Sequence, residues 1–232
     1  MDKQGSRRLA GVSGILFVVL TYTSVILGDT PILGGLGEPP PGAGGEEWVA
    51  YFTTSHTALL VKSYLWGLAF CFFLVFVGGL CGAVWGGQER LRVLGLVAFG
   101  GGVTATALQL ASSAVSWAAV RSAQEELDPQ MASVLREVSF ILLVSAWFPL
   151  AVLLAAVALG VALTQALPRW LGWAAGLLAV GFLGTALLMA VSPFSLVWIF
   201  VYMLFALWII ITSIILIGRA ARGRPQRSLR RR

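Results

Sequence analysis

The sequence predicts an all-α protein, a polytopic transmembrane bundle of six spans with both termini in the cytoplasm. Three observations lead to this fold class. Apolar residues make up 58% of the 232 residues and charged residues only 11%, whereas a soluble domain is typically about 25% charged. Six stretches are almost free of charge and long enough to cross a bilayer core, which takes roughly 20 apolar residues. Basic residues gather at every second break between these stretches.

The predicted spans lie near residues 9–28, 63–85, 93–118, 138–164, 170–191 and 194–218. They form one transmembrane domain, residues 1–218, followed by a basic cytoplasmic tail, residues 219–232. Basic residues precede the first span, as they do in a signal peptide. That stretch is as long as a full span, however, and no A-x-A-like site follows it directly, so we expect it to be retained.

The charge distribution predicts the orientation. Thirteen of the sixteen basic residues lie in the N-terminus, residues 86–92, residues 165–169 and the tail, and eight of the ten acids lie on the other side. The positive-inside rule places the basic segments in the cytoplasm. The tail contains seven arginines, each worth about 1 kcal/mol of attraction near an anionic surface. The predicted partners are therefore the bilayer and its anionic inner-leaflet lipids, not nucleic acid.

The external segment 29–62 has two parts. Its first half is rich in glycine and proline and is predicted to be coil. In the second half Glu46 and Glu47 suit the first turn of a helix, and Trp48, Tyr51, Phe52 and Leu59 recur at helical spacing. We expect a short amphipathic helix on the outer surface. It either packs on the bundle or floats in the interface, or it forms a lid over an outward-facing cavity.

The fourth span begins with a helix-start signal, Asp128 as N-cap followed by Pro129 at the first helical position. A helix from there to about Thr164 would be roughly 54 Å long, so it should protrude on the outer side. Pro149 lies in its middle and removes the hydrogen bond to the Ser145 carbonyl, which predicts a kink.

Two further patterns concern packing. Ser192-Pro193 is a second cap pair and predicts a tight outer hairpin between the last two spans. Glycines spaced four residues apart let helix backbones approach closely, either within the chain or at a homodimer seam; they are Gly78, Gly82, Gly86, Gly172 and Gly176.

The third span has a polar stripe on one face. Its residues are Thr106, Gln109, Ser113 and Ser116, with Trp117 at the outer end. Gln109 is costly to place in hydrocarbon without a partner. The stripe either forms interhelical hydrogen bonds, worth about 0.6 kcal/mol each, or lines a small polar cavity in the outer leaflet. These five residues are the predicted ligand-binding set.

Enzymatic roles are not favoured by the sequence. The chain has one histidine, His56, and the acidic pairs Glu46-Glu47 and Glu125-Glu126 have no second histidine with which to bind a metal. A G-x-S-x-G motif is absent, and no ionisable residue falls near a predicted helix midpoint, where proton-coupled pumps usually need one. We therefore predict no catalytic residue, metal site or cofactor.

The stretches RRLAGVSGILFVVLTYTSVILGD, residues 7–29, and LPRWLGWAAGLLAVGFL, residues 167–183, carry a family resemblance. They resemble an uncharacterised family of six-helix bacterial membrane proteins, often from actinobacteria, with a basic-flanked first helix and a PRWLGW-like start of the fifth. The resemblance covers the order of elements across most of the chain. It implies a bacterial plasma membrane protein and assigns no residue a role.

Two functional hypotheses follow. The first is a protein that binds or transports a small neutral or amphipathic molecule from the outer side. The second is a non-transporting scaffold or regulatory subunit that acts through a membrane partner or a second copy of itself. A cavity lined by convergent polar groups would distinguish them, because a scaffold can be filled solid.

Overall fold

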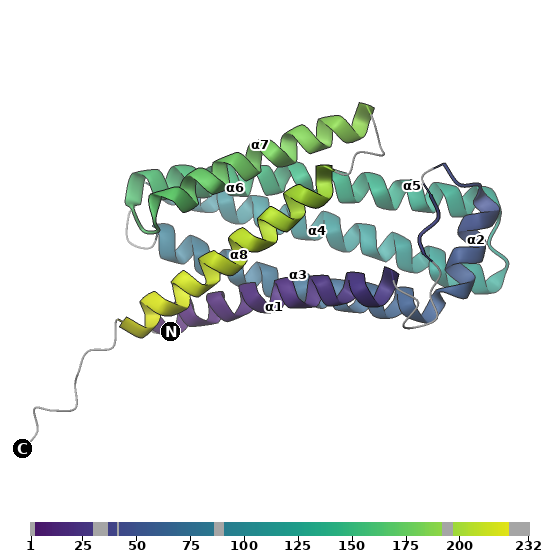
Figure 1. The fold of residues 1–232 in the computed structure, drawn as a ribbon, viewed down its shortest axis with the longest axis horizontal. Helices are drawn as coiled ribbons and strands as arrows, with labels where there is room; N and C mark the ends of the chain where they lie inside the picture. Colours follow the sequence, from purple (N-terminus) through teal and green to yellow (C-terminus); the bar gives the residue numbers. More distant parts are fainter. Residues whose placement is uncertain (1–2, 30–36, 41, 86–90, 192–196, 223–232) are drawn as a thin grey trace, which may run out of the picture.

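The computed structural model describes the chain except residues 1–2, 30–36, 41, 86–90, 192–196 and 223–232 (Figure 1). The described residues form helices and no strands. Six helical stretches among them are long and apolar enough to cross a membrane. The prediction of an all-α bundle with six spans is thus confirmed. Its helices are α1 (Lys3–Asp29), α2 (Gly45–Thr54), α3 (His56–Trp85), α4 (Arg92–Ser122), α5 (Pro129–Ser145), α6 (Trp147–Thr164), α7 (Arg169–Val191) and α8 (Val197–Arg222), with the short 3-10 helix η3 (Ala123–Glu125).

Several helix ends differ from the predicted ones. The second span, α3, begins at His56 instead of residue 63, so the last part of the expected external segment belongs to this helix. The third span, α4, continues to Ser122. The last helix, α8, runs to Arg222, beyond residue 218 where the span was expected to end. Each added segment contains a basic residue, Lys62, Arg121 or Arg219, and the helix continues past it because backbone hydrogen bonding does not stop where hydropathy falls.

The fourth span begins and is interrupted where the sequence predicts. The Asp128 side chain accepts hydrogen bonds from the backbone N–H groups of Gln130 (2.7 Å) and Met131 (3.2 Å), and Pro129 occupies the first turn. The span covers 36 residues but is divided into α5 and α6 at Ala146. Pro149 has no N–H for the Ser145 carbonyl, so the helical ladder is interrupted at this point.

Close backbone approach occurs at particular glycines. A Cβ on Gly101 of α4 would lie 2.6 Å from the Pro149 carbonyl oxygen of α6, so only glycine lets these two helices approach this closely. Gly79 of α3 lies equally tightly against Ala10 of α1. These contacts hold α4 against α6 and α3 against α1, two of the main helix pairs of the bundle.

The predicted glycine pattern of the second span does not make such contacts within the chain. A Cβ on Gly78 would meet only Phe99 at 3.8 Å, and one on Gly82 would meet nothing within 4 Å. Gly86 and the predicted hairpin at Ser192-Pro193 lie outside the described residues. In the fifth span a Cβ on Gly172 would lie 3.0 Å from Val161, which marks a tight contact between α7 and α6.

The helices end at different positions along the long axis of the bundle. In Figure 1, α3, α4 and α5 continue to the end of the bundle at which α2 lies, whereas α7 and α8 stop well short of it. The main hydrophobic core lies among the long helices. A second, smaller core joins α2 to the nearby ends of α3, α4 and α5 through Trp48, Tyr51, Phe52, Leu59, Ala119, Val120, Ala123 and Ala132.

Exposed aromatic residues lie near both ends of the bundle. Tyr64 of α3 and Trp117 of α4 are exposed on the half that carries α2, and Trp170 and Trp173 are exposed at the opposite end, in the first turns of α7. Tryptophan and tyrosine favour the two membrane–water interfaces. Their positions agree with six helices that cross a bilayer.

Candidate functional site

A cavity of about 560 Å³ occupies the half of the bundle that carries α2. Its walls come from α1, α2, α3, α4, α5 and α8, and they are mostly apolar. Cavities of roughly 300–1,000 Å³ with apolar walls and a few convergent polar groups are typical ligand sites. The polar groups of this cavity lie in three places. We call the part at Arg136 and Glu38 the mouth, the part at the serines of α4 and α5 the wall, and the part at Tyr202 of α8 the floor.

Helix α2 closes one side of the cavity. Trp48, Tyr51 and Phe52 lie on its buried face, and all three contribute to the cavity lining. The helix is fixed to the bundle by the hydrogen bond from Thr53 Oγ1 to the Ala123 carbonyl (3.4 Å) and by the second core. The amphipathic helix predicted around Trp48 therefore exists as α2. It packs on the bundle and contributes three side chains to the cavity lining.

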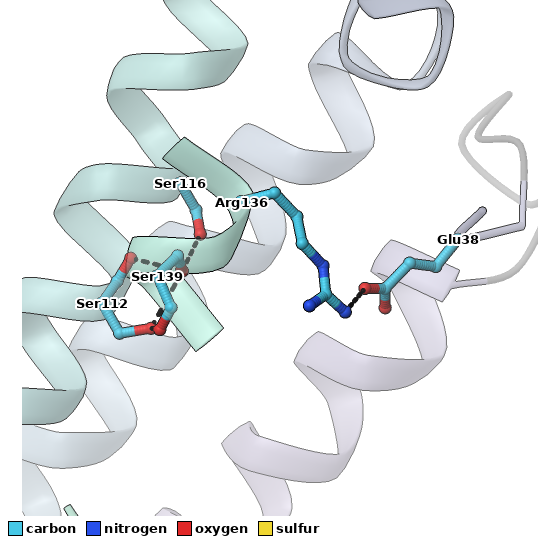
Figure 2. A network of polar contacts seen from close by, with 5 residues as sticks. All are labelled: Glu38, Ser112, Ser116, Arg136 and Ser139. Atoms are coloured by element: carbon cyan, nitrogen blue, oxygen red, sulfur yellow. Dashed lines mark hydrogen bonds and ion pairs between the residues drawn. The ribbon is translucent and has the colours of Figure 1, made fainter. Parts of the chain in front are cut away.

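The mouth of the cavity contains an arginine held by aromatic rings. Arg136 of α5 is half-buried, and its guanidinium carbon lies 5.0 Å from the Trp48 ring centre and 4.8 Å from that of Phe140. Its Nη2 donates to Glu38 Oε1 at 3.4 Å. Figure 2 shows the Arg136 side chain extending from α5 toward Glu38 and away from the serines of the wall. Cation–π contacts of this kind fix the position of a cation in a partly desolvated place.

The wall contains three serines that join α4 to α5. Ser112 Oγ donates to the Ser139 carbonyl (2.7 Å), and Ser139 Oγ donates to the Ser112 carbonyl (3.0 Å). Each hydroxyl has one proton, so Ser139 Oγ can in addition only accept, and Ser116 Oγ lies 2.7 Å from it as the donor. Figure 2 shows the three side chains turned toward one another. We call Ser112, Ser116 and Ser139 the serine clasp.

The floor of the cavity is formed by Tyr202 of α8 and the aromatic side chains below it. Tyr202 Oη accepts hydrogen bonds from Gln109 Nε2 and Trp147 Nε1, both at 3.1 Å. Beside Tyr202, Phe17 and Phe205 line the cavity and belong to the main core. The floor thus combines a buried polar network with apolar rings.

The five residues of the predicted ligand-binding set lie in different places. Ser113 and Ser116 line the cavity, and Ser116 is part of the serine clasp. Gln109 is buried behind Tyr202 and is not a lining residue. Thr106 is buried below it, and no described residue is a partner for its Oγ1. Trp117 is 57% exposed and lies in a shallow apolar depression with Leu60, Val61, Tyr64 and Leu65, outside the cavity.

Helical phase explains this distribution. The predicted stripe follows one face of α4, but α4 is surrounded by α3, α5 and α6, and each part of that face meets a different neighbour. Toward Ser116 the face meets α5 and the cavity. Deeper in the bundle it meets buried side chains. Trp117 follows Ser116 by one residue and is rotated by about 100°, because a helix has 3.6 residues per turn, so it faces outward.

Three residues of this candidate site were not predicted from the sequence. Ser139, Arg136 and Tyr202 contribute a clasp, a cation and a hydrogen-bond acceptor from helices other than α4. Arg136 and Ser139 are three residues apart and share a helix face with Phe140, a spacing that could have indicated a polar face on α5. Nothing in the sequence indicated that Tyr202 lies against Gln109, because 93 residues separate them.

Part of the cavity wall is exposed on the outside of the bundle. Tyr22 and Val25 of α1 and Ile199 and Met203 of α8 line the cavity, and all four are also exposed. Further down, α1 and α8 are in tight contact, where Gly11 and Gly14 lie against Ser213. Figure 1 shows α8 running obliquely across the bundle, away from α1 toward its own N-terminus. The cavity therefore opens sideways between the C-terminal half of α1 and the N-terminal half of α8.

Among the described residues, no group of three or more His, Cys, Asp or Glu side chains is arranged to hold a metal ion. The comparisons with protein-family models, with curated proteins and with solved structures find no match to this chain.

Proposed function

We propose that this chain is a multi-pass protein of a bacterial plasma membrane that binds a small neutral or amphipathic molecule in the cavity covered by α2. The observation that carries the proposal is the cavity itself, with its apolar walls and its polar groups at mouth, wall and floor. It favours ligand binding over the alternative of a scaffold or regulatory subunit, since a scaffold needs no cavity of this size. The uneven charge distribution supports an outer location for α2.

Within the cavity, Ser113 is the residue of the predicted set best placed to contact a ligand. The hydroxyls of the serine clasp are occupied with one another, whereas Ser113 lines the cavity and takes no part in the clasp. Gln109 acts through Tyr202, whose hydroxyl it fixes from behind. On this proposal the ligand lies along apolar walls and meets few polar groups, as expected for a neutral or amphipathic molecule.

The structure favours binding over open passage. Below the floor, the core contains large, fully buried side chains, including Phe73, Leu80 and Leu216. Any transport would require these helices to move apart. Binding from one side needs no such movement, so binding is the simpler function and transport remains an extension of it.

Photo-crosslinking tests the proposal. The protein is reconstituted in nanodiscs of zwitterionic phosphatidylcholine and exposed to hexadecanol that carries a diazirine in its chain, and labelled residues are mapped by mass spectrometry. We expect labels on cavity-lining residues such as Trp66 and Leu143. Ser113→Trp should fill the cavity and suppress these labels. Ala114→Trp is the matched control, because Ala114 is the next residue on α4, is exposed and does not line the cavity.

The folded state of both variants is checked by their thermal unfolding before labelling is compared. Labels spread evenly over the lipid-facing surface, or cavity labels that survive Ser113→Trp as well as Ala114→Trp, would overturn the proposal.

A further inference from the structure

Charged residues form a small part of the cavity lining. Among the described lining residues, Arg136 and Lys62 are cations and Glu38 is the single acid. Arg136 places a positive charge beside the apolar walls. A positive charge beside an apolar cavity favours a ligand with a negative group at one end.

Arg136 is held in place independently of its acidic partner. The Trp48 and Phe140 rings fix its guanidinium at about 5 Å, and only 26% of its side chain is exposed. A guanidinium has five N–H donors in a planar fork, and a single bond from Nη2 to Glu38 is described for it. The fork is thus positioned for the bidentate contact that arginine makes with a carboxylate.

Glu38 binds the Arg136 guanidinium only weakly. Its carboxylate contacts Arg136 through one oxygen, at 3.4 Å, which is long for a charge-assisted hydrogen bond. Its side chain is 49% exposed, and it lies in a segment without regular structure ahead of α2. A carboxylate that approached Arg136 from the cavity could bind two nitrogens of the fork and release Glu38 to water.

The sideways opening indicates where such a molecule comes from. Tyr22, Val25, Ile199 and Met203 form cavity wall and outer surface at once. In helices that cross a membrane, exposed apolar side chains meet lipid chains. An acyl chain can therefore pass between the C-terminal half of α1 and the N-terminal half of α8 without leaving an apolar environment. The walls that it meets inside, including Phe17 and Phe205, are apolar as well.

We propose that the ligand is a long-chain carboxylate taken from the bilayer, whose head group replaces Glu38 on Arg136 while its chain lies in the cavity. This inference rests on the proposed function, because it names the chemical class of the ligand in the same cavity. Glu38 is then a competitor that occupies the head-group position when the cavity is empty.

The test compares two photoreactive probes with the same chain, palmitate and hexadecanol, in phosphatidylcholine nanodiscs at an alkaline pH at which the carboxylate is ionised. In the unmodified protein, palmitate should label the cavity about tenfold more than hexadecanol, the ratio expected for one good charge-assisted contact. Arg136→Gln should remove this preference. Glu38→Gln should raise palmitate labelling several-fold and leave hexadecanol labelling unchanged.

Matched controls separate this contact from general charge effects. Glu47→Gln and Arg121→Gln each remove an exposed charge near α2 that does not line the cavity, and both should leave the preference intact. Equal labelling by the two probes in the unmodified protein, or reduced palmitate labelling in Glu38→Gln, would overturn the inference while the proposed function stands. Cavity labelling by neither probe would overturn both. If Arg136→Gln does not fold, the increase in palmitate labelling expected for Glu38→Gln still tests the inference.

Discussion

Replacing Ser139 by alanine should weaken the attachment of α5 to α4. By proton count, the Ser139 hydroxyl takes part in two interhelical hydrogen bonds, one donated to the Ser112 carbonyl and one accepted from Ser116. The third bond of the clasp, from Ser112 Oγ to the Ser139 carbonyl, uses only backbone on the α5 side and survives the substitution. Ser139→Ala thus removes two of three bonds without changing the main chain.

The magnitude follows from that count. At about 0.6 kcal/mol for each interhelical bond in a membrane protein, Ser139→Ala should lower the free energy of unfolding by about 1.2 kcal/mol. Ser112→Ala and Ser116→Ala each remove one bond and should cost about 0.6 kcal/mol. The double variant Ser116→Ala/Ser139→Ala should cost no more than Ser139→Ala alone, which corresponds to a coupling energy of about 0.6 kcal/mol.

Equilibrium unfolding in mixed micelles, with increasing dodecyl sulfate, measures these differences. Ser133→Ala is the matched control on the same helix, because the Ser133 hydroxyl bonds only to the Pro129 carbonyl four residues earlier in α5. We expect it to change the free energy of unfolding by little. A cost for Ser139→Ala no larger than that for Ser133→Ala, or additive costs in the double variant, would refute the proton assignment of the clasp.

Four further predictions test other parts of the structure. Gly101→Ala should cost about 1–3 kcal/mol because its methyl group would overlap the α6 backbone, whereas Gly100→Ala, which meets nothing within 4 Å, should be neutral in the same unfolding assay. Tyr202→Phe leaves two buried donors without an acceptor and should lower the free energy of unfolding by about 1–3 kcal/mol. An unchanged free energy of unfolding would contradict the hydrogen bonds of the floor. Gly44→Cys, in a background without native cysteines, should react with an impermeant maleimide in intact cells, and reaction only after lysis would reverse the orientation. Replacing the arginines of residues 219–232 with glutamine should weaken binding of the tail peptide to anionic vesicles by up to about 1 kcal/mol per arginine, and unchanged binding would argue against a lipid role.

The predicted features that the structure reproduces are those set by local physics. Asp128 and Pro129 start a helix because their capping bonds lie within three residues of the chain. Pro149 interrupts its helix because it lacks an N–H, wherever the neighbours lie. The short helix around Trp48 was indicated by helical periodicity and by Glu46 and Glu47 in its first turn. The start of α3 was predicted too late in the chain, because hydropathy does not mark the first residue of a helix's hydrogen-bonded ladder.

The candidate site was predicted less well. Gln109 was expected to find a partner, and its Nε2 donates to Tyr202, whereas no described residue is a partner for its Oε1. The cost of burying an amide could neither name that partner nor tell a cavity wall from the layer behind it. Ser113 and Ser116 line the cavity, while Trp117, one residue further on, faces outward. One helical stripe was treated as one surface, although its neighbours change along its length.

The sequence by itself determined that this chain is a bundle of six apolar helices, because length, hydropathy, caps and prolines act over a few residues and a bilayer demands that each spanning backbone satisfy its own hydrogen bonds. Only the tertiary structure decided that Arg136 would lie between Trp48 and Phe140, that three serines would join α4 to α5, and that α1 and α8 would part to open a cavity. These are contacts between residues far apart in the chain. Their geometry depends on how all the helices pack at once, and no local pattern encodes it.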